Sequence, residues 1–318
     1  MNLLEKVIVN IFKVNLSVKK TETVLIVIDK NKRKIGKLFL KIGGEFTKKI
    51  DLIEIPVGRI NGDEPPKKIA KKMLSYNVEL LITTMSLTHT KARKNASEKG
   101  ARIATLPNIT ESTLKRALNV DYKKMHKRIE KISNALDKGK IATITSKQGA
   151  NLTLSIKGRK AHGRTSGIFT KKGKYGNLPD GESFIAPVEG TAKGVYIIDG
   201  SVGSIGKVDK PIKVFVEDGY VKKITGGEAA KQLKKSLNKI GKKSRNIAEL
   251  GIGANDKAVI SGNMLEDEKV MGTCHIALGN NTSFGGKVDV PLHIDGLIKK
   301  PTIFIDNKKV MQEGKLLL

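Results

Sequence analysis

The chain has 318 residues, of which 39% are hydrophobic, and a formal net charge of +29. This length predicts about two domains, and the hydrophobic content excludes a chain that is disordered throughout. A single cysteine, Cys274, excludes an intrachain disulfide, and no apolar run reaches the ~18 residues of a membrane span, so we expect a cytoplasmic protein without membrane segments.

The basic charge by itself is compatible with nucleic-acid binding. However, only 9 of the 60 basic residues are arginine, the lysines are spread along the whole chain, and aromatic residues make up 4% of it. Lysine lacks the planar fork that recognises phosphates and bases, and stacking platforms are scarce. We therefore expect a solvated lysine-rich surface and no nucleic-acid partner.

The first part of the chain alternates strands and helices. Short apolar runs predict strands at 23–28, 50–57, 78–84 and 101–107, and the segments between them predict helices at 31–38, 65–76 and 91–100. This alternation is typical of a parallel sheet covered by helices, so we expect a Rossmann-like α/β domain over residues 1–135. No G-x-G-x-x-G follows the first strand, so no dinucleotide cofactor is expected.

The second part of the chain has a different sequence pattern. After a charged helix predicted at 121–137, residues 141–158 alternate around a Gly-Ala-Asn turn, which predicts a hairpin, and one further helix is expected at 228–240. Glycines recur and the strands are short. We expect a mixed α+β metal-binding catalytic domain over residues 136–318.

The strongest local motif is Pro291-Leu-His-Ile-Asp-Gly296. Residues two apart on a strand share a face, so His293 and Asp295 are expected to point the same way. Such a pair is half of a metal site, although a hydrogen-bonded His–Asp pair at a strand end explains the motif equally well.

Four further residues stand in apolar surroundings and favour the metal site. His275 begins the apolar stretch HIALG, Glu249 lies in a strand that ends in glycines, Glu182 follows a turn, and Glu268 precedes His275. Buried acids are costly unless they are paired or coordinated. Together with His293 and Asp295 these residues suit one or two divalent cations.

Motifs along most of the chain resemble the thermophilic aminopeptidase family of metallopeptidases, typified by aminopeptidases T and S. The segments that carry the resemblance are 86–110, 177–201, 248–255, 265–279 and 285–306. The resemblance implies an α/β protein, often a homodimer, that removes N-terminal residues from peptides. It also implies metal ligands at Glu182, Glu249, Glu268, His275, His293 and Asp295.

On that basis we expect two divalent ions, zinc, cobalt or manganese, with Glu249 as the bridging carboxylate. The ions lower the pKa of a shared water, and Glu268 is the candidate for proton transfer.

One departure from the family favours a second hypothesis for the reaction. A tyrosine expected soon after His275 is missing, because GNNTSFGG (279–286) follows. The same scaffold is shared with 2,5-dihydroxypyridine dioxygenases, in which His275, His293 and Asp295 would form a two-histidine, one-carboxylate site for Fe(II). We rank the aminopeptidase first, since three additional carboxylates suit a pair of hard cations better than one iron.

The remaining candidates receive structural interpretations. His162 is either a surface histidine, which we favour, or a residue that contacts substrate. We expect a structural role for His89, a solvent-facing side chain for His126, and a buried inert thiol at Cys274. The basic run 231–245 is expected to be a solvated helix face.

Overall fold

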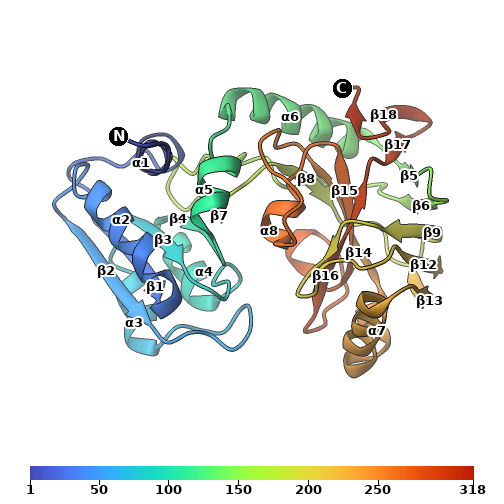
Figure 1. Cartoon of the computed structure of the whole chain (residues 1–318), viewed down its shortest axis with the longest axis horizontal. Coiled ribbons are helices and arrows are strands. Elements are labelled where there is room, and N and C mark those ends of the chain that lie inside the picture. The colour runs from blue at the N-terminus through green and yellow to red at the C-terminus, as the bar shows by residue number, and fades with distance from the viewer. The chain divides into compact units, whose positions relative to one another are not determined.

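The computed structural model describes residues 1–318 and divides into two compact units (Figure 1). The first contains Met1–Tyr122 and Gly167–Asp180, and the second contains Lys123–Ser166 and Gly181–Leu318. The second unit holds all six of the predicted metal ligands.

The division differs from the boundary predicted at residue 135, which falls inside helix α6 (Tyr122–Lys138). Met125, Ile129 and Leu136 are buried on one face of this continuous helix, and Ser133 Oγ lies 2.7 Å from Ser183 Oγ of the second unit. The helix therefore belongs almost entirely with the second unit. Local patterns also gave no sign that residues 167–180 return to the first unit.

The first unit is built on a five-stranded sheet in the order β2-β1-β3-β4-β7, with every neighbouring pair parallel. The strands are β1 (Val24–Asp29), β2 (Ile50–Ile55), β3 (Val78–Ile82), β4 (Arg102–Thr105) and β7 (Tyr175–Asn177). The four strands predicted for this region and their parallel arrangement are confirmed. Strand β7 was not predicted, because it is contributed by the returning segment.

Helices supply an apolar core on each face of this sheet. They are α1 (Leu3–Asn10), α2 (Arg33–Gly43), α3 (Lys67–Met73), α4 (Lys91–Glu98) and α5 (Glu111–Ala117), with shorter turns η1 (Ile11–Asn15) and η2 (Lys30–Lys32). Leu4, Phe39 and Leu114 belong to one core, and Met73 and Ala96 belong to the other. The predicted α/β layering is thereby confirmed.

The second unit contains two antiparallel sheets. The six-stranded sheet has the order β11-β10-β16-β15-β14-β8, and its strands are β8 (Glu182–Ile185), β10 (Ser201–Val202), β11 (Gly206–Lys207), β14 (Ile247–Gly253), β15 (Thr273–Gly279) and β16 (His293–Lys299). This sheet carries five of the six predicted metal ligands, all except Glu268.

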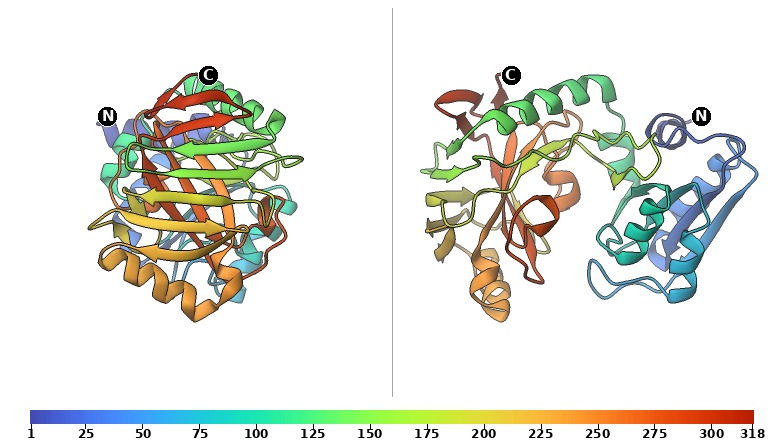
Figure 2. Two further views of the ribbon diagram at one scale, coloured as in Figure 1. Left: turned by 90° about the vertical axis from the view of Figure 1, so that its right-hand side faces the viewer. Right: turned by 180° about the vertical axis from the view of Figure 1, so that it is seen from behind.

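The eight-stranded sheet has the order β13-β12-β9-β6-β5-β17-β18-β19 and faces the viewer in the left view of Figure 2. Its strands are β5 (Ile141–Thr145), β6 (Asn151–Ser155), β9 (Lys193–Ile198), β12 (Ile212–Glu217), β13 (Tyr220–Thr225), β17 (Thr302–Ile305), β18 (Lys308–Gln312) and β19 (Lys315–Leu316). The predicted hairpin is confirmed as the β5–β6 pair. The helical elements of this unit are α6, α7 (Glu228–Ile240), α8 (Met264–Asp267), η3 (Lys242–Arg245) and η4 (Thr282–Phe284), and α7 was predicted with these bounds.

The two sheets pack closely where β9 meets β16, because any side chain at Gly296 would collide with Ile198. All residues of β14 and β15 are buried. Successive residues of a strand point to opposite faces, so a strand buried at every position is covered on both sides. Ionisable residues on β14 and β15 therefore lie inside the unit.

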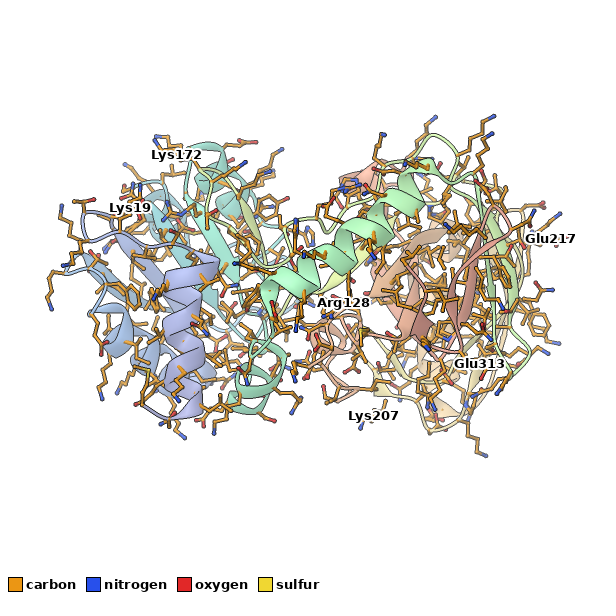
Figure 3. All side chains as sticks on the ribbon, turned by 90° about the horizontal axis from the view of Figure 1, so that it is seen from above. Lys19, Arg128, Lys172, Lys207, Glu217 and Glu313 are labelled. Carbon is orange, nitrogen blue, oxygen red and sulfur yellow. The ribbon has the colours of Figure 1, made fainter.

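The lysines lie almost entirely on the surface, where Lys19, Lys172 and Lys207 project away from the ribbon in Figure 3. Lys32 and Lys269 are the two buried exceptions. No helix of the chain is long and apolar enough to cross a bilayer.

Candidate metal centre

The register of four adjacent strands places five of the six predicted site residues on one face of the six-stranded sheet, and the sixth, Glu268, follows α8. Glu249 and Asp295 both lie opposite Ala277 of β15, which separates them. Two residues along β15 in one direction His275 lies opposite Gly251, and two residues in the other direction Gly279 lies opposite His293. The small residues at positions 251, 277 and 279 leave room between the larger side chains.

Gly251 is required beside His275. A Cβ atom built on Gly251 would lie 2.1 Å from the imidazole ring, far inside van der Waals contact. Because β14 is backbone only at this position, the ring lies across it and reaches Glu249. Gly251, the first glycine of the motif ELGIG, thus makes room for the imidazole.

The imidazole and carboxylate groups converge as two clusters. His275 Nε2 lies 3.1 Å from Glu249 Oε1 and 3.5 Å from Glu182 Oε2, and His293 Nε2 lies 3.4 Å from both Glu249 Oε2 and Asp295 Oδ1. Ligand atoms of Glu249, His293 and Asp295 all lie within 4.8 Å of one another, and the same holds for Glu182, Glu268 and His275. The structure therefore brings together all six residues named from the sequence.

The site is mostly closed to solvent but open at one residue. The side chains of Glu182, Glu249 and His275 are buried, whereas that of His293 is 34% exposed. Solvent therefore reaches the cluster at His293.

The close approach of these ionisable groups shifts their pKa values. Burial disfavours the charged form of both histidines, but nearby carboxylates outweigh it and raise the pKa of His275 to about 9 and that of His293 to about 10. Burial also opposes ionisation of Asp295, yet the charge and hydrogen bond of His293 hold its pKa well below the usual range.

Two glutamates behave in the opposite way. Burial raises the pKa of Glu182, and it raises the pKa of Glu268 to about 8, against the pull of Lys269. The protein alone thus does not stabilise all of these carboxylates in their ionised form.

The donor set fits a divalent cation. Glu182 Oε2 and His275 Nδ1 are buried without a hydrogen-bond partner, and the carboxylates outnumber the cationic side chains around them. A cation bound among His275, His293, Asp295 and Glu249 would neutralise this excess of negative charge.

Lys269 is a site residue that the sequence did not reveal. It follows Glu268 and lies before β15, and its Nζ donates to Glu182 Oε1 at 2.5 Å and to Glu268 Oε1 at 2.6 Å. Its side chain is 3% exposed. In the charged segment LEDEK nothing distinguishes a buried lysine from a solvated one.

Aromatic side chains form one wall of the site. The His162 ring stacks on Phe184 at 5.7 Å between centroids, and Phe284 meets the ring of His293 edge-on at 5.9 Å. Burial lowers the pKa of His162, which is only partly accessible. The favoured prediction of a surface loop residue is therefore wrong, since His162 packs into this wall. Phe284 lies in the segment where a tyrosine was expected and offers no hydroxyl.

The other residues singled out from the sequence lie outside the cluster. His89 and His126 are exposed, as predicted for His126, and Cys274 is buried on the face opposite His275, where burial raises the pKa of its thiol. The lysines of the basic run on α7 are exposed on one helix face, which confirms that prediction.

Comparisons with known proteins place this geometry in a family. A family model described as NicX, 2,5-dihydroxypyridine 5,6-dioxygenase, matches residues 49–318. The 2,5-dihydroxypyridine 5,6-dioxygenase of Pseudomonas putida KT2440 is 24% identical over 254 residues, which cover 74% of this chain and 70% of that protein.

Solved structures share the fold at low sequence identity. The structure of 2,5-dihydroxypyridine dioxygenase from Pseudomonas putida KT2440 has a TM-score of 0.81 at 17% identity and covers 99% of this chain and 96% of its own. Wild-type AmpT from Thermus thermophilus has a TM-score of 0.73 at 14% identity, with 99% of both chains covered.

These findings confirm the predicted scaffold and support an enzyme, while the specific assignment to an aminopeptidase is not confirmed. Because the family model spans residues 49–318, the chain belongs to the NicX family of 2,5-dihydroxypyridine 5,6-dioxygenases.

Proposed function

We propose that this protein is a metal-dependent dioxygenase that opens an electron-rich hydroxylated aromatic ring, with one Fe(II) ion held by His275, His293 and Asp295. The observation that carries the proposal is that both imidazoles contact Glu249, at 3.1 Å from His275 and 3.4 Å from His293, while Asp295 lies 3.4 Å from His293. When bound to such a triad, Fe(II) supplies the oxygen-dependent redox chemistry of ring cleavage and keeps coordination positions open.

The residues around the triad suit an aromatic substrate. Phe184 and Phe284 pack beside His162 and His293 and offer an apolar wall against which a flat ring packs favourably. Glu249, in contact with both imidazoles, is a carboxylate able to accept the acidic proton of a ring hydroxyl. The side chains of the site thus orient the aromatic substrate, exclude water from it and accept its proton.

The direct test is oxygen uptake by the full-length protein reconstituted anaerobically with Fe(II) and mixed with 2,5-dihydroxypyridine. We expect oxygen uptake that is coupled to loss of the ring absorbance. In His293→Ala the rate of oxygen uptake should decrease at least about 100-fold, because a ligand of the ion is removed. His126→Ala, at an exposed histidine, is the matched control and should retain full activity. Uptake unaffected by His293→Ala would contradict the proposal.

A metal-dependent aminopeptidase remains the second candidate, favoured by the presence of two three-residue groups and by the fold shared with AmpT. In this alternative, zinc, cobalt or manganese ions would supply a metal-activated water, Glu249 would be among the residues that hold them, and Glu268 would be the candidate for proton transfer. Release of N-terminal residues from peptides under anaerobic conditions, without oxygen uptake, would establish this reaction over the first. The homodimer implied by the family resemblance stays a prediction, which light scattering of the purified protein would test.

A further inference from the structure

The loop of residues 280–292 joins β15 to β16 beside the candidate metal centre. Its two ends are bonded to each other, since Asn280 N donates to Leu292 O at 2.8 Å, and its only regular element is the three-residue turn η4. A loop of this length whose ends meet is an Ω-loop, a class that is packed by its own side chains and is frequently functional. The contacts that hold this loop therefore bear on the site beside it.

The base and the tip of the loop contact the site in different ways. At the base, His293 Nδ1 donates to Asn280 O at 2.8 Å, and the base is fixed by the β15–β16 pairing, in which Gly279 lies opposite His293. At the tip, the ring of Phe284 meets those of Phe184 and His293 edge-on, at 5.5 and 5.9 Å between centroids. The tip pairs with no strand, so the position of Phe284 depends on other contacts.

Hydrogen bonds within the loop make its tip a single body. Asn281 is completely buried, its Oδ1 accepts from Val288 N at 2.9 Å, and its main-chain O accepts from Gly286 N at 2.9 Å. These bonds tie together both sides of the tip around Phe284. Any displacement of Asn281 therefore displaces the Phe284 ring as well.

An ion pair outside the metal centre holds this tip. Glu189 Oε1 accepts from Asn281 Nδ2 at 3.0 Å and from Lys287 N at 2.7 Å, while Glu189 Oε2 accepts from Arg159 Nη2. Arg159 Nη1 in turn donates to the carbonyl oxygen of Gly285. The Arg159–Glu189 pair thus bonds the loop at three positions on either side of Phe284.

The pair is itself attached to the eight-stranded sheet. The neighbour of Glu189, Val188, donates its N–H to the carbonyl of Ser155 in β6 at 2.8 Å. The side chains of Arg159 and Glu189 are only 12% and 21% exposed, so water screens them less than it screens a surface pair. Burial opposes ionisation of Glu189, yet its hydrogen bonds and Arg159 lower its pKa. The carboxylate is therefore a charged, fixed acceptor at neutral pH.

We propose that Arg159 and Glu189 are positioning residues that fix the tip of the loop and so hold Phe284 in place as the surface on which the aromatic substrate packs. Neither residue belongs to the metal centre, and their effect on the reaction passes through the Phe284 ring. The inference rests on the proposed function and deepens it, because it names the contacts that set the affinity for a flat ring.

Hydrogen exchange of the metal-free, full-length protein tests the structural step. The reporters are the amides of Gly286 and Val288, which bond to Asn281 and not to Glu189 itself. In Glu189→Gln, which is isosteric but uncharged, we expect both amides to exchange at least about 10-fold faster, because bonds to a charged acceptor are weakened. Glu217→Gln, at a carboxylate that is 72% exposed, is the matched control and should exchange like the wild type.

Steady-state oxygen uptake by the Fe(II)-reconstituted protein tests the functional step. In Glu189→Gln we expect KM for 2,5-dihydroxypyridine to rise about 10-fold while kcat changes less than about 3-fold, because substrate packing is lost and the metal ligands are untouched. Phe284→Leu should raise KM by a similar factor. The double variant should be no worse than either single variant, since Glu189 acts through Phe284. Glu217→Gln should keep the wild-type KM.

The outcomes separate the inference from the proposed function. Unchanged exchange at Gly286 and Val288 in folded Glu189→Gln would overturn the inference whatever reaction the enzyme catalyses. A lower kcat at constant KM, or additive effects in the double variant, would overturn it too. Absence of oxygen uptake in the wild type would contradict the proposed function, and the exchange rates would then decide whether the pair fixes the loop.

A second variant covers a failure of Glu189→Gln to fold, which circular dichroism would reveal. Arg159→Met breaks the pair from its other side and also removes the bond to Gly285. We expect faster exchange at Gly286 and Val288 and a higher KM in this variant as well. Wild-type values for both would overturn the inference.

Discussion

Glu79 in β3 of the first unit and Glu249 in β14 of the second are both glutamates on strands buried at every position. Both carboxylate oxygens of Glu79 lack a hydrogen-bond partner, and burial raises its pKa well above the usual value. Glu249 instead contacts the imidazoles of His275 and His293. The difference teaches that a buried acid does not by itself mark a site. What marks the site is a second ionisable group on the same face of the sheet.

The largest expected effect comes from removing that second group. His275→Ala should weaken binding of the divalent ion about 1,000-fold, equivalent to about 4 kcal/mol, because an imidazole ligand at the centre of the cluster is lost. Competition with a chromophoric chelator would measure the change, and the circular dichroism of the metal-free variant would check its fold. Unchanged affinity would mean that His275 acts only as a packing residue, like Glu79.

Arg102 in the first unit is the counterpart of His275, because it is paired with an acid but belongs to no candidate metal site. Its guanidinium donates to both carboxylate oxygens of Glu22 at 2.8 and 2.9 Å and also to the carbonyl of Leu16. Arg102→Ala should lower the free energy of unfolding of that unit by about 2 kcal/mol, since it leaves the partly buried carboxylate of Glu22 with only the backbone N–H of Lys19 as a partner. Denaturant unfolding would measure the loss, and metal affinity should not change. A parallel loss of metal affinity would show that the comparison between the units does not hold.

The pH dependence of metal binding tests whether both imidazoles of the second unit bind the ion. In the absence of metal both His275 and His293 are protonated at pH 7, because their pKa values are raised to about 9 and about 10. A metal ion binds only the neutral imidazoles, so it displaces both protons. Its apparent affinity should rise about 100-fold from pH 7 to pH 8.

Calorimetric titration in two buffers with different ionisation enthalpies would count these released protons. We expect about two protons per ion, and release of about one or none would mean that the two imidazoles are not both ligands.

The smallest expected effect concerns Glu79. Because burial raises its pKa in the folded protein, the folded state binds this proton more tightly than the unfolded state, and the associated stability declines as pH rises above the unfolded value. Glu79→Leu should remove this decline and stabilise the first unit by about 1–2 kcal/mol at neutral pH, since an unsatisfied polar group is eliminated. Thermal unfolding between pH 5 and pH 8 would show it. Glu79→Gln, which stays polar but does not titrate, is the control: it should also remove the decline with pH but should gain less stability than Glu79→Leu.

Local patterns predicted much of the fold. The apolar runs 23–28 and 78–84 and the helix at 228–240 were recognisable because each has the period of its own element, and the structure confirms them. The return of residues 167–180 to the first unit was not predictable, because β7 is a three-residue strand that is defined only by its pairing with β4.

For the candidate site, too, local periodicity was predictable and long-range pairing was not. The shared face of His293 and Asp295 is a consequence of strand periodicity, and the sequence alone was sufficient to predict it. The membership of His162 in the aromatic wall was missed, because its backbone pairs with Phe184 across the fold and nothing in the surrounding basic loop indicates this.

The sequence by itself determined which residue types are present and which neighbours along a strand share a face. Only the tertiary structure decided that Glu249, His275 and Asp295 converge, because no tight turn joins β14, β15 and β16 and their register therefore depends on long-range packing. The tertiary structure also decided that Lys269, one of many lysines, points inward between two carboxylates. A salt bridge in the interior forms only when the fold excludes water from all of its partners at once.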